Sequence, residues 1–239
     1  MDRVPNFPAL TARNAVSYWF GAFLLGNVAS LLAVGLFWRP EGDADRFPVW
    51  ITAVSALALW GVFVAFVVML SRGIGSGSLR HDFGLAFRWS DLWVGVPVGV
   101  VSQFGLVVLV NWPLSRLFPG AFGPDEVERR ARELSDSAPG AWFLLLVLVV
   151  VVAAPVVEEL MYRGLLQQGL ANSWGRTAAV VVGSAVFAAV HLQPVEFPGL
   201  FAFAVVLGIC YARTDRLGLP IVAHMTFNAC GIAVVSLLR

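Results

Sequence analysis

Residues 141–154, AWFLLLVLVVVVAA, contain no charge and lead directly into residues 155–169, PVVEELMYRGLLQQG, which contain two adjacent glutamates and an arginine. An apolar run of this kind predicts a helix that lies in a lipid bilayer. An ionised group at bilayer depth costs roughly 2.5 to 3.5 kcal/mol on insertion scales. Glu158, Glu159 and Arg163 therefore need a compensating reason for their position, and we infer that this reason is chemistry.

The composition predicts an integral membrane protein. Of the 239 residues, 59% are hydrophobic and 13% are charged, and the mean hydropathy is +0.80, which exceeds what the core of a soluble domain requires. Helices satisfy their own backbone hydrogen bonds in hydrocarbon. The expected fold class is therefore all-α, a polytopic transmembrane helical bundle. All basic residues are arginines and the net charge is +1, so no basic stripe for nucleic acid is present.

The hydropathy pattern predicts about seven spanning helices. Their ranges are 15–37, 48–70, 92–112, 139–172, 176–192, 198–213 and 219–238. We expect one membrane domain in two parts: residues 1–140, with three spans, an interfacial segment and a polar loop, and residues 141–239, a four-helix core. Cys210 and Cys230 lie in apolar segments without metal-type spacing, which is typical of packing residues.

Two polar connections lie in the first part. Residues 71–93 alternate apolar with charged side chains, which predicts a segment at the membrane interface with His81 solvated. In residues 113–140, Pro124 followed by two acids predicts a surface helix, interpreted as a solvated lid or flap. The distribution of arginines favours a cytoplasmic N-terminus. We expect a protein of a bacterial cytoplasmic membrane.

The charged residues of the fourth helix divide by helical geometry. Glu159 and Arg163 are spaced i, i+4, so they lie on one face and can form an internal ion pair. Glu158 points about 100° away from that face. It is therefore free to face a cavity of low dielectric constant, where a carboxylate becomes a stronger base.

Two later helices carry further polar residues in apolar surroundings. His191 ends the fifth helix, and His224 and Asn228 share one face of the seventh by i, i+4 spacing. Either histidine alone could equally form an interhelical hydrogen bond. As a set, Glu158 and His191 could hold and deprotonate a water, while His224 and Asn228 donate hydrogen bonds to the oxyanion of an amide under attack. No serine or cysteine nucleophile is required.

Three motifs, EExxxR at 158–163, FxxxH at 187–191 and HxxxN at 224–228, resemble those of the CAAX protease and bacteriocin-processing family of intramembrane proteases. The resemblance covers residues 141–239, and the first three spans match only in general character. It implies a glutamate-dependent endopeptidase that cuts near the C-terminus of a substrate within the membrane. Its implied catalytic residues are Glu158, His191, His224 and Asn228. Its implied supporting or substrate-binding residues are Glu159, Arg163, Tyr162 and Phe187.

A metal-dependent version remains open at this stage. Glu158, His191 and His224 could supply three zinc ligands and leave a fourth position for water. The chain has no HExxH helix, however, and direct activation of water suits the same residues. We favour a mechanism that requires no cofactor.

Other functions are also compatible with the sequence. A non-catalytic membrane scaffold or bacteriocin-immunity protein could retain the same fold, and a transporter ranks last because inverted repeats are not evident. The expected partners of the peptidase are the bilayer and a peptide or lipidated protein substrate, whose identity and need for prenylation the sequence does not specify. The relative depths of Glu158 and His191 predict a long fourth helix that projects from the bilayer, tilts or bends at Pro155.

Overall fold

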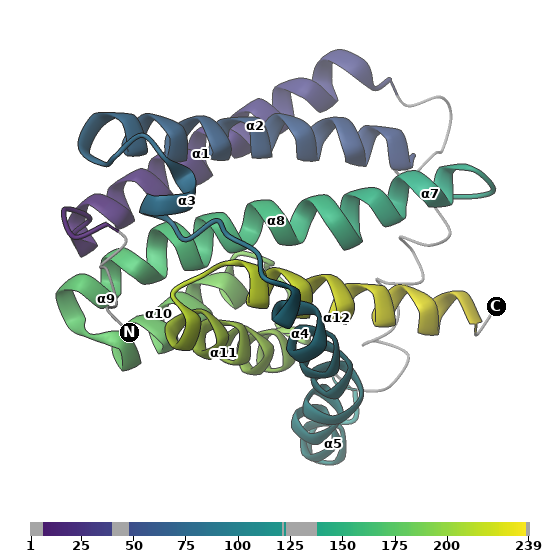
Figure 1. Ribbon diagram of the computed structural model, residues 1–239. Coiled ribbons are helices and arrows are strands. Elements are labelled where there is room, and N and C mark those ends of the chain that lie inside the picture. Colours follow the sequence, from purple (N-terminus) through teal and green to yellow (C-terminus); the bar gives the residue numbers. More distant parts are fainter. Residues whose placement is uncertain (1–6, 40–47, 121, 123–137, 238–239) are drawn as a thin grey trace.

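The computed structural model describes residues 7–39, 48–120, 122 and 138–237, and within these ranges it contains helices and no strand (Figure 1). The predicted surface helix that begins near Pro124 lies outside the described residues. The α-helices are α1 (Ala12–Phe37), α2 (Val49–Ile74), α3 (Leu79–Asp82), α4 (Trp89–Val101), α5 (Val107–Leu117), α7 (Trp142–Val147), α8 (Ala154–Glu159), α9 (Gln168–Trp174), α10 (Arg176–Ala189), α11 (Phe197–Thr214) and α12 (Gly218–Leu237). Three π-helical segments join some of them: η1 (Ser102–Leu106), η2 (Leu148–Ala153) and η3 (Leu160–Gln167).

Six helices in the described ranges are long and apolar enough to cross a membrane, which confirms the polytopic helical bundle. The fourth runs from Trp142 to Trp174 through α7, η2, α8, η3 and α9, and its 33 residues confirm the predicted long helix. At 1.5 Å per residue it is about 50 Å long, more than the hydrocarbon core of a bilayer. The predicted fifth span is the shorter helix α10, which ends at Ala189 instead of continuing to Leu192.

The segment between α2 and α4, which we predict to lie at the membrane interface, packs two of its residues into the bundle. Phe83 is fully buried against Phe7, and Asp82 is also buried. Burial alone would raise the pKa of Asp82, but hydrogen bonds from Ser71 and Ser76 outweigh it and hold that pKa below its ordinary value. The alternation of apolar and polar residues does not predict the burial of Asp82 and Phe83. It reveals neither the contact with Phe7 nor the hydrogen bonds from Ser71 and Ser76. His81 is exposed, as predicted.

Helix α4 is held closely against α12. A Cβ atom at Gly95 would lie 2.7 Å from Val222, and one at Gly99 would lie 2.5 Å from the carbonyl oxygen of Ala223, so glycine is required at both positions. This small-xxx-small pattern is the usual means of close helix contact in membranes. The contact fixes α12 at the residue that precedes His224.

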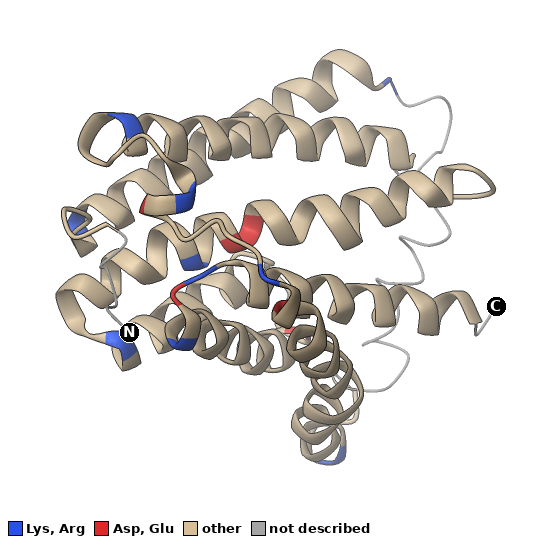
Figure 2. Cartoon of the chain, viewed as in Figure 1, with Lys and Arg blue, Asp and Glu red and all other residues tan. Residues whose placement is uncertain are grey.

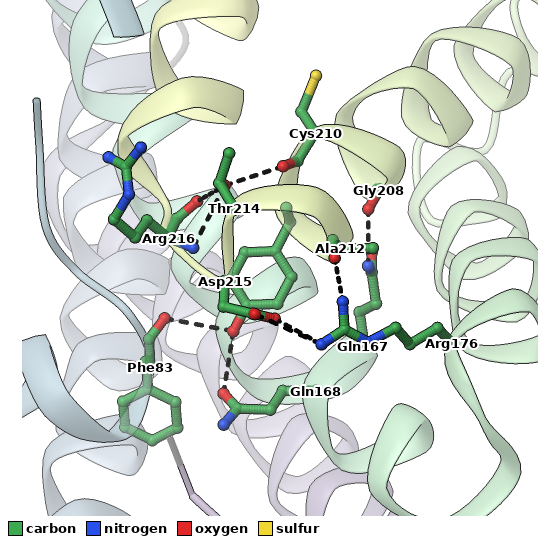
Figure 3. A network of polar contacts seen from close by, with 11 residues as sticks. Phe83, Gln167, Gln168, Arg176, Gly208, Cys210, Ala212, Thr214, Asp215 and Arg216 are labelled. Atoms are coloured by element: carbon green, nitrogen blue, oxygen red, sulfur yellow. Dashed lines mark hydrogen bonds and ion pairs between the residues drawn. The ribbon is translucent and has the colours of Figure 1, made fainter. Parts of the chain in front are cut away.

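Helix α11 is tied to the second half of the long fourth helix by the polar network in Figure 3. Gln167 Nε2 donates to the carbonyl oxygen of Gly208 at 2.9 Å, and the Tyr211 hydroxyl donates to Gln168 Oε1 at 3.0 Å. At the end of α11, Arg176 pairs with Asp215 at 3.0 Å. These bonds set the register of α11 relative to η3, α9 and the start of α10.

Candidate active site

The site begins with the buried pair on the long helix. Arg163 Nη1 donates to Glu159 Oε1 at 2.9 Å, with Glu159 fully buried and Arg163 2% exposed, so the predicted ion pair is confirmed. Arg163 Nη2 donates to the carbonyl oxygen of Ala204 on α11 at 3.1 Å. Its guanidinium also lies 4.7 Å from the ring centre of Phe187, in cation–π geometry. Buried charges need such additional partners to offset their desolvation.

Helix α12 brings His224 to the same carboxylate. His224 Nδ1 lies 2.8 Å from Glu159 Oε1, so this oxygen is shared by His224 and Arg163. The imidazole is 4% exposed and packs edge-to-face against the rings of Phe187 and Phe203. Glu159 therefore orients His224 and also neutralises Arg163. Sequence reasoning missed this contact, because 65 residues separate the partners and no local spacing joins them.

Glu158 lies on the other side of the same imidazole. Its Oε2 is 3.8 Å from His224 Nε2, and its side chain is 22% exposed, unlike that of Glu159. Figure 2 shows this acidic segment of α8 as red within a bundle that is otherwise mostly tan. His224 is thus placed between two carboxylates of different exposure.

Asn228 is oriented by the π-helical segment before α8. Its Nδ2 donates to the carbonyl oxygen of Val150 in η2 at 2.9 Å. A carboxamide nitrogen carries two hydrogens, so the second remains available for another acceptor. π-helical segments occur frequently at functional sites. Here η2 and η3 flank α8 on both sides, and η2 supplies the carbonyl group that fixes Asn228.

His191 follows the end of α10, and its ring is fixed by its own chain. His191 Nδ1 lies 2.8 Å from the carbonyl oxygen of Phe187, and a carbonyl oxygen can only accept. Nδ1 therefore carries a hydrogen, and in the neutral ring Nε2 presents its lone pair. The ring of His191 is 4.9 Å from that of Phe187, and the ring of His224 is 5.8 Å from it. The two imidazoles consequently lie no farther apart than the sum of these distances.

Phe187 is the common contact of the predicted residues. Its ring touches Tyr162 at 5.0 Å in a T-shaped arrangement, in addition to Arg163 and both histidines. Tyr162 in turn packs against Trp19 of α1. The fold therefore brings the three motifs together around one aromatic ring. Glu158 contacts His224. It makes no such contact with His191, the residue predicted to hold the water together with it.

The zinc alternative requires three ligands that converge. Within the described residues, no group of three His, Cys, Asp or Glu side chains is placed to hold a metal ion. Glu158 and His224 approach each other, but His191 does not complete a set with them. The arrangement does not fit a three-ligand site, and no step below is routed through a metal.

Comparisons with known proteins agree with the motifs. The profile of the family described as "Type II CAAX prenyl endopeptidase Rce1-like" matches residues 140–230. The Bacillus subtilis (strain 168) protein named "Putative membrane peptidase YdiL" is 24% identical over 220 residues, which cover 88% of this chain and 86% of that protein. The protein named "Uncharacterized protein YpbD" of the same organism is 27% identical over 142 residues, 58% of this chain and 65% of its own length. No solved structure matches the chain.

The matched range contains all four residues predicted to be catalytic, Glu158, His191, His224 and Asn228. It also contains the supporting pair Glu159 and Arg163. The resemblance predicted from the three motifs is confirmed, since residues 140–230 match the model of the Rce1-like family of type II CAAX prenyl endopeptidases.

Proposed function

We propose that this protein is an intramembrane endopeptidase that hydrolyses a peptide bond near the C-terminus of a membrane-associated or prenylated peptide. The observation that carries the proposal is the partly exposed carboxylate of Glu158, 3.8 Å from a histidine whose other nitrogen is anchored by a buried glutamate. Of these two adjacent carboxylates, Glu159 positions the histidine and Glu158 takes part in proton transfer.

Glu158 accepts the proton of the attacking water. Glu159 is unsuited to this step, because it is fully buried and its Oε1 already binds both Arg163 and His224. The Nε2 lone pair of neutral His191 accepts a second hydrogen bond from the same water and orients it. Proton transfer by a positioned side chain of this kind contributes typically 10²- to 10⁴-fold to a rate.

Asn228 and His224 stabilise the oxyanion that forms on the carbonyl group. Asn228 donates its second Nδ2 hydrogen, the one that is not bonded to the carbonyl oxygen of Val150. Because Nδ1 of His224 donates to Glu159, its Nε2 can donate only when the ring carries both protons. Glu158 then returns its proton to the leaving amine, so atoms and charge balance without a covalent intermediate. The mechanism uses no metal and no cofactor.

We also propose that the N-terminus lies in the cytoplasm. Arg72 in the last turn of α2 is exposed, as are Arg80 and Arg88 between α2 and α4, and Figure 2 shows arginines gathered at the end of the bundle where α1 begins. An excess of arginine in short loops favours the cytoplasmic side. Reporters that work on one side only, fused to each terminus, test this orientation. A periplasmic signal at the N-terminus would contradict it.

The decisive experiment replaces Glu158 with glutamine, which keeps the shape of the side chain but cannot accept a proton. Wild type and Glu158→Gln are reconstituted in liposomes and presented with a doubly labelled library of C-terminal peptides, with and without a prenyl group. We expect a loss of 10²- to 10⁴-fold in cleavage rate with unchanged thermal unfolding. Glu41→Gln, outside the motifs, serves as the matched control.

A different outcome would favour the scaffold function. If Glu158→Gln folds and supports the biological phenotype as well as wild type does, the protein acts by binding and hydrolysis is not its role.

A further inference from the structure

The polar face of α12 continues beyond the residues assigned above. His224, Asn228 and Gly231 follow one another at i, i+4 and i+7, so they lie on one stripe of the helix. Among the described residues beyond its own stretch of helix, the one atom within 4 Å of a Cβ placed at Gly231 is Gln103 Nε2, at 3.9 Å. The stripe therefore ends at a sparsely packed position, in contact with the carboxamide of Gln103.

Gln103 has no role in the bundle that explains its polarity. It lies in the membrane-spanning range Trp89–Leu117, within η1, and is half-buried. The part of the chain that the structure describes offers its carboxamide no hydrogen-bond partner. By contrast, the carboxamides of Gln167 and Asn228 each bond a carbonyl group of another helical segment. A polar group at membrane depth without a partner is costly and indicates a function.

The position of Gln103 relative to the site is fixed by packing. Gly99, one turn earlier, lies directly against Ala223 and Thr226 of α12, and Ser102 is buried. Gln103 extends from a π-helical segment, the kind of irregularity that frequently marks functional positions. Its carboxamide is thus held beside α12 on the far side of Asn228 from His224.

We propose that Gln103 binds a backbone peptide group of the substrate, with Gly231 as the floor of this subsite. The inference rests on the proposed function and extends it to substrate binding. A carboxamide offers an acceptor and two donors, which match the C=O and N–H of a peptide group whatever its side chain. From His224 to Gly231 is about 10 Å along the helix, which an extended peptide covers in about three residues. Gln103 therefore contacts the backbone about three residues from the scissile bond.

The first test is the substitution Gln103→Leu, which keeps the approximate size and removes the polar group. Because the carboxamide has no partner in the bundle, thermal unfolding should be unchanged or shifted upward. For the best-cleaved peptide of the library we expect KM to rise about 3- to 10-fold with kcat unchanged, since a lost ground-state hydrogen bond acts on binding. A structural role would instead lower the unfolding temperature and kcat together, and that result would overturn the proposal.

Three further variants make the comparison specific. Asn27→Leu removes another half-buried membrane carboxamide, one that donates within its own helix to the Phe23 carbonyl oxygen, and should leave KM unchanged. Gly231→Leu fills the sparsely packed end of the stripe and should raise KM at least as much as Gln103→Leu. Gly231→Ala, whose Cβ would lie at ordinary contact distance, should have the smaller effect.

The bonded position is identified with the same peptide N-methylated at one amide at a time. At one position, two to four residues from the scissile bond, methylation should weaken wild type but add no further loss in Gln103→Leu. Additive losses at every position overturn the proposal.

A binding measurement separates this proposal from the proposed function. The affinity of the labelled peptide is measured for Glu158→Gln with and without Gln103→Leu. Weaker binding in the double variant supports the subsite, even if wild type cleaves no peptide, in which case only the proposed function fails. Cleavage by wild type with equal binding by both variants overturns the subsite alone. If wild type cleaves no peptide and neither variant binds one, both proposals fail.

Discussion

The two sides of His224 differ in how their polar atoms are used. On the anchored side, formed by Glu159, Arg163 and the carbonyl group of Ala204, charges are buried and bonded to one another. On the open side, Glu158 lies 3.8 Å from the other imidazole nitrogen, and we propose that His191 and Asn228 act on the substrate together with it. Adjacent residues of one helix point about 100° apart, and here Glu158 approaches Nε2 of the imidazole while Glu159 binds its Nδ1. Glu159 thus fixes the position of His224, and we propose that Glu158 carries out the proton transfer.

The largest effect is expected when the charge of the anchored glutamate, Glu159, is removed. In Glu159→Gln the charge of Arg163 stays buried without a counterion, so we expect a loss of about 3–5 kcal/mol in the free energy of unfolding, together with loss of activity. Glu158→Gln should lose activity only. Unfolding in detergent and peptide cleavage measure the two effects. Asp215→Asn, in the more exposed pair with Arg176, is the control and should cost at most about 1 kcal/mol.

A double substitution separates positioning from folding. Glu159→Leu with Arg163→Met replaces the buried pair by apolar side chains and should restore most of the stability. Activity should stay low, because His224 Nδ1 no longer has its acceptor. Recovery of activity in this variant would show that Glu159 serves only the stability of the bundle.

The second prediction concerns the donor on the open side. Asn228→Ala removes an oxyanion donor and should lower kcat by about 10²- to 10³-fold with a smaller change in KM. It also removes a hydrogen bond to Val150, which is worth about 1 kcal/mol of stability. Single-turnover cleavage of the best peptide measures the effect on the chemical step.

Asn172→Ala provides the matched control for this loss. Its Nδ2 donates to the carbonyl oxygens of Phe7 and Leu10, both at 2.9 Å, so the substitution costs stability in a similar way. Its kcat should remain close to that of wild type. If the two variants lose the same fraction of kcat, Asn228 is a structural residue and the oxyanion donor lies elsewhere.

The anchored and open sides also differ in how far they could be predicted. The Glu159–Arg163 pair and the shared face of His224 and Asn228 follow from the period of the α-helix, which is local and visible in sequence. The contact of His224 with Glu159 and the bond from Asn228 to Val150 depend on packing between distant helices. No spacing encodes them.

The π-helical segments of the long helix also could not be predicted from the sequence. The π-helical segments η2 and η3 have no composition of their own, because apolar residues of a membrane helix suit α- and π-helical turns alike. The boundaries of the spans were predictable from hydropathy, and α10 is shorter than predicted because the turn after Ala189 breaks the helix before the apolar residues end. The burial of Phe83 likewise arises from tertiary packing against Phe7.

The prediction with the smallest expected effect concerns the role of a metal ion at Glu158 and His224. The proposed mechanism needs only Glu158, His191, His224 and Asn228, and within the described residues no three possible ligands converge. Exhaustive chelation followed by removal of the chelator should therefore leave kcat/KM unchanged within error, and the metal content of active protein should not track its activity. A loss of activity that zinc restores would contradict this expectation. It would also give Glu158 and His224, now only 3.8 Å apart, the role of ligands that must move to admit the ion.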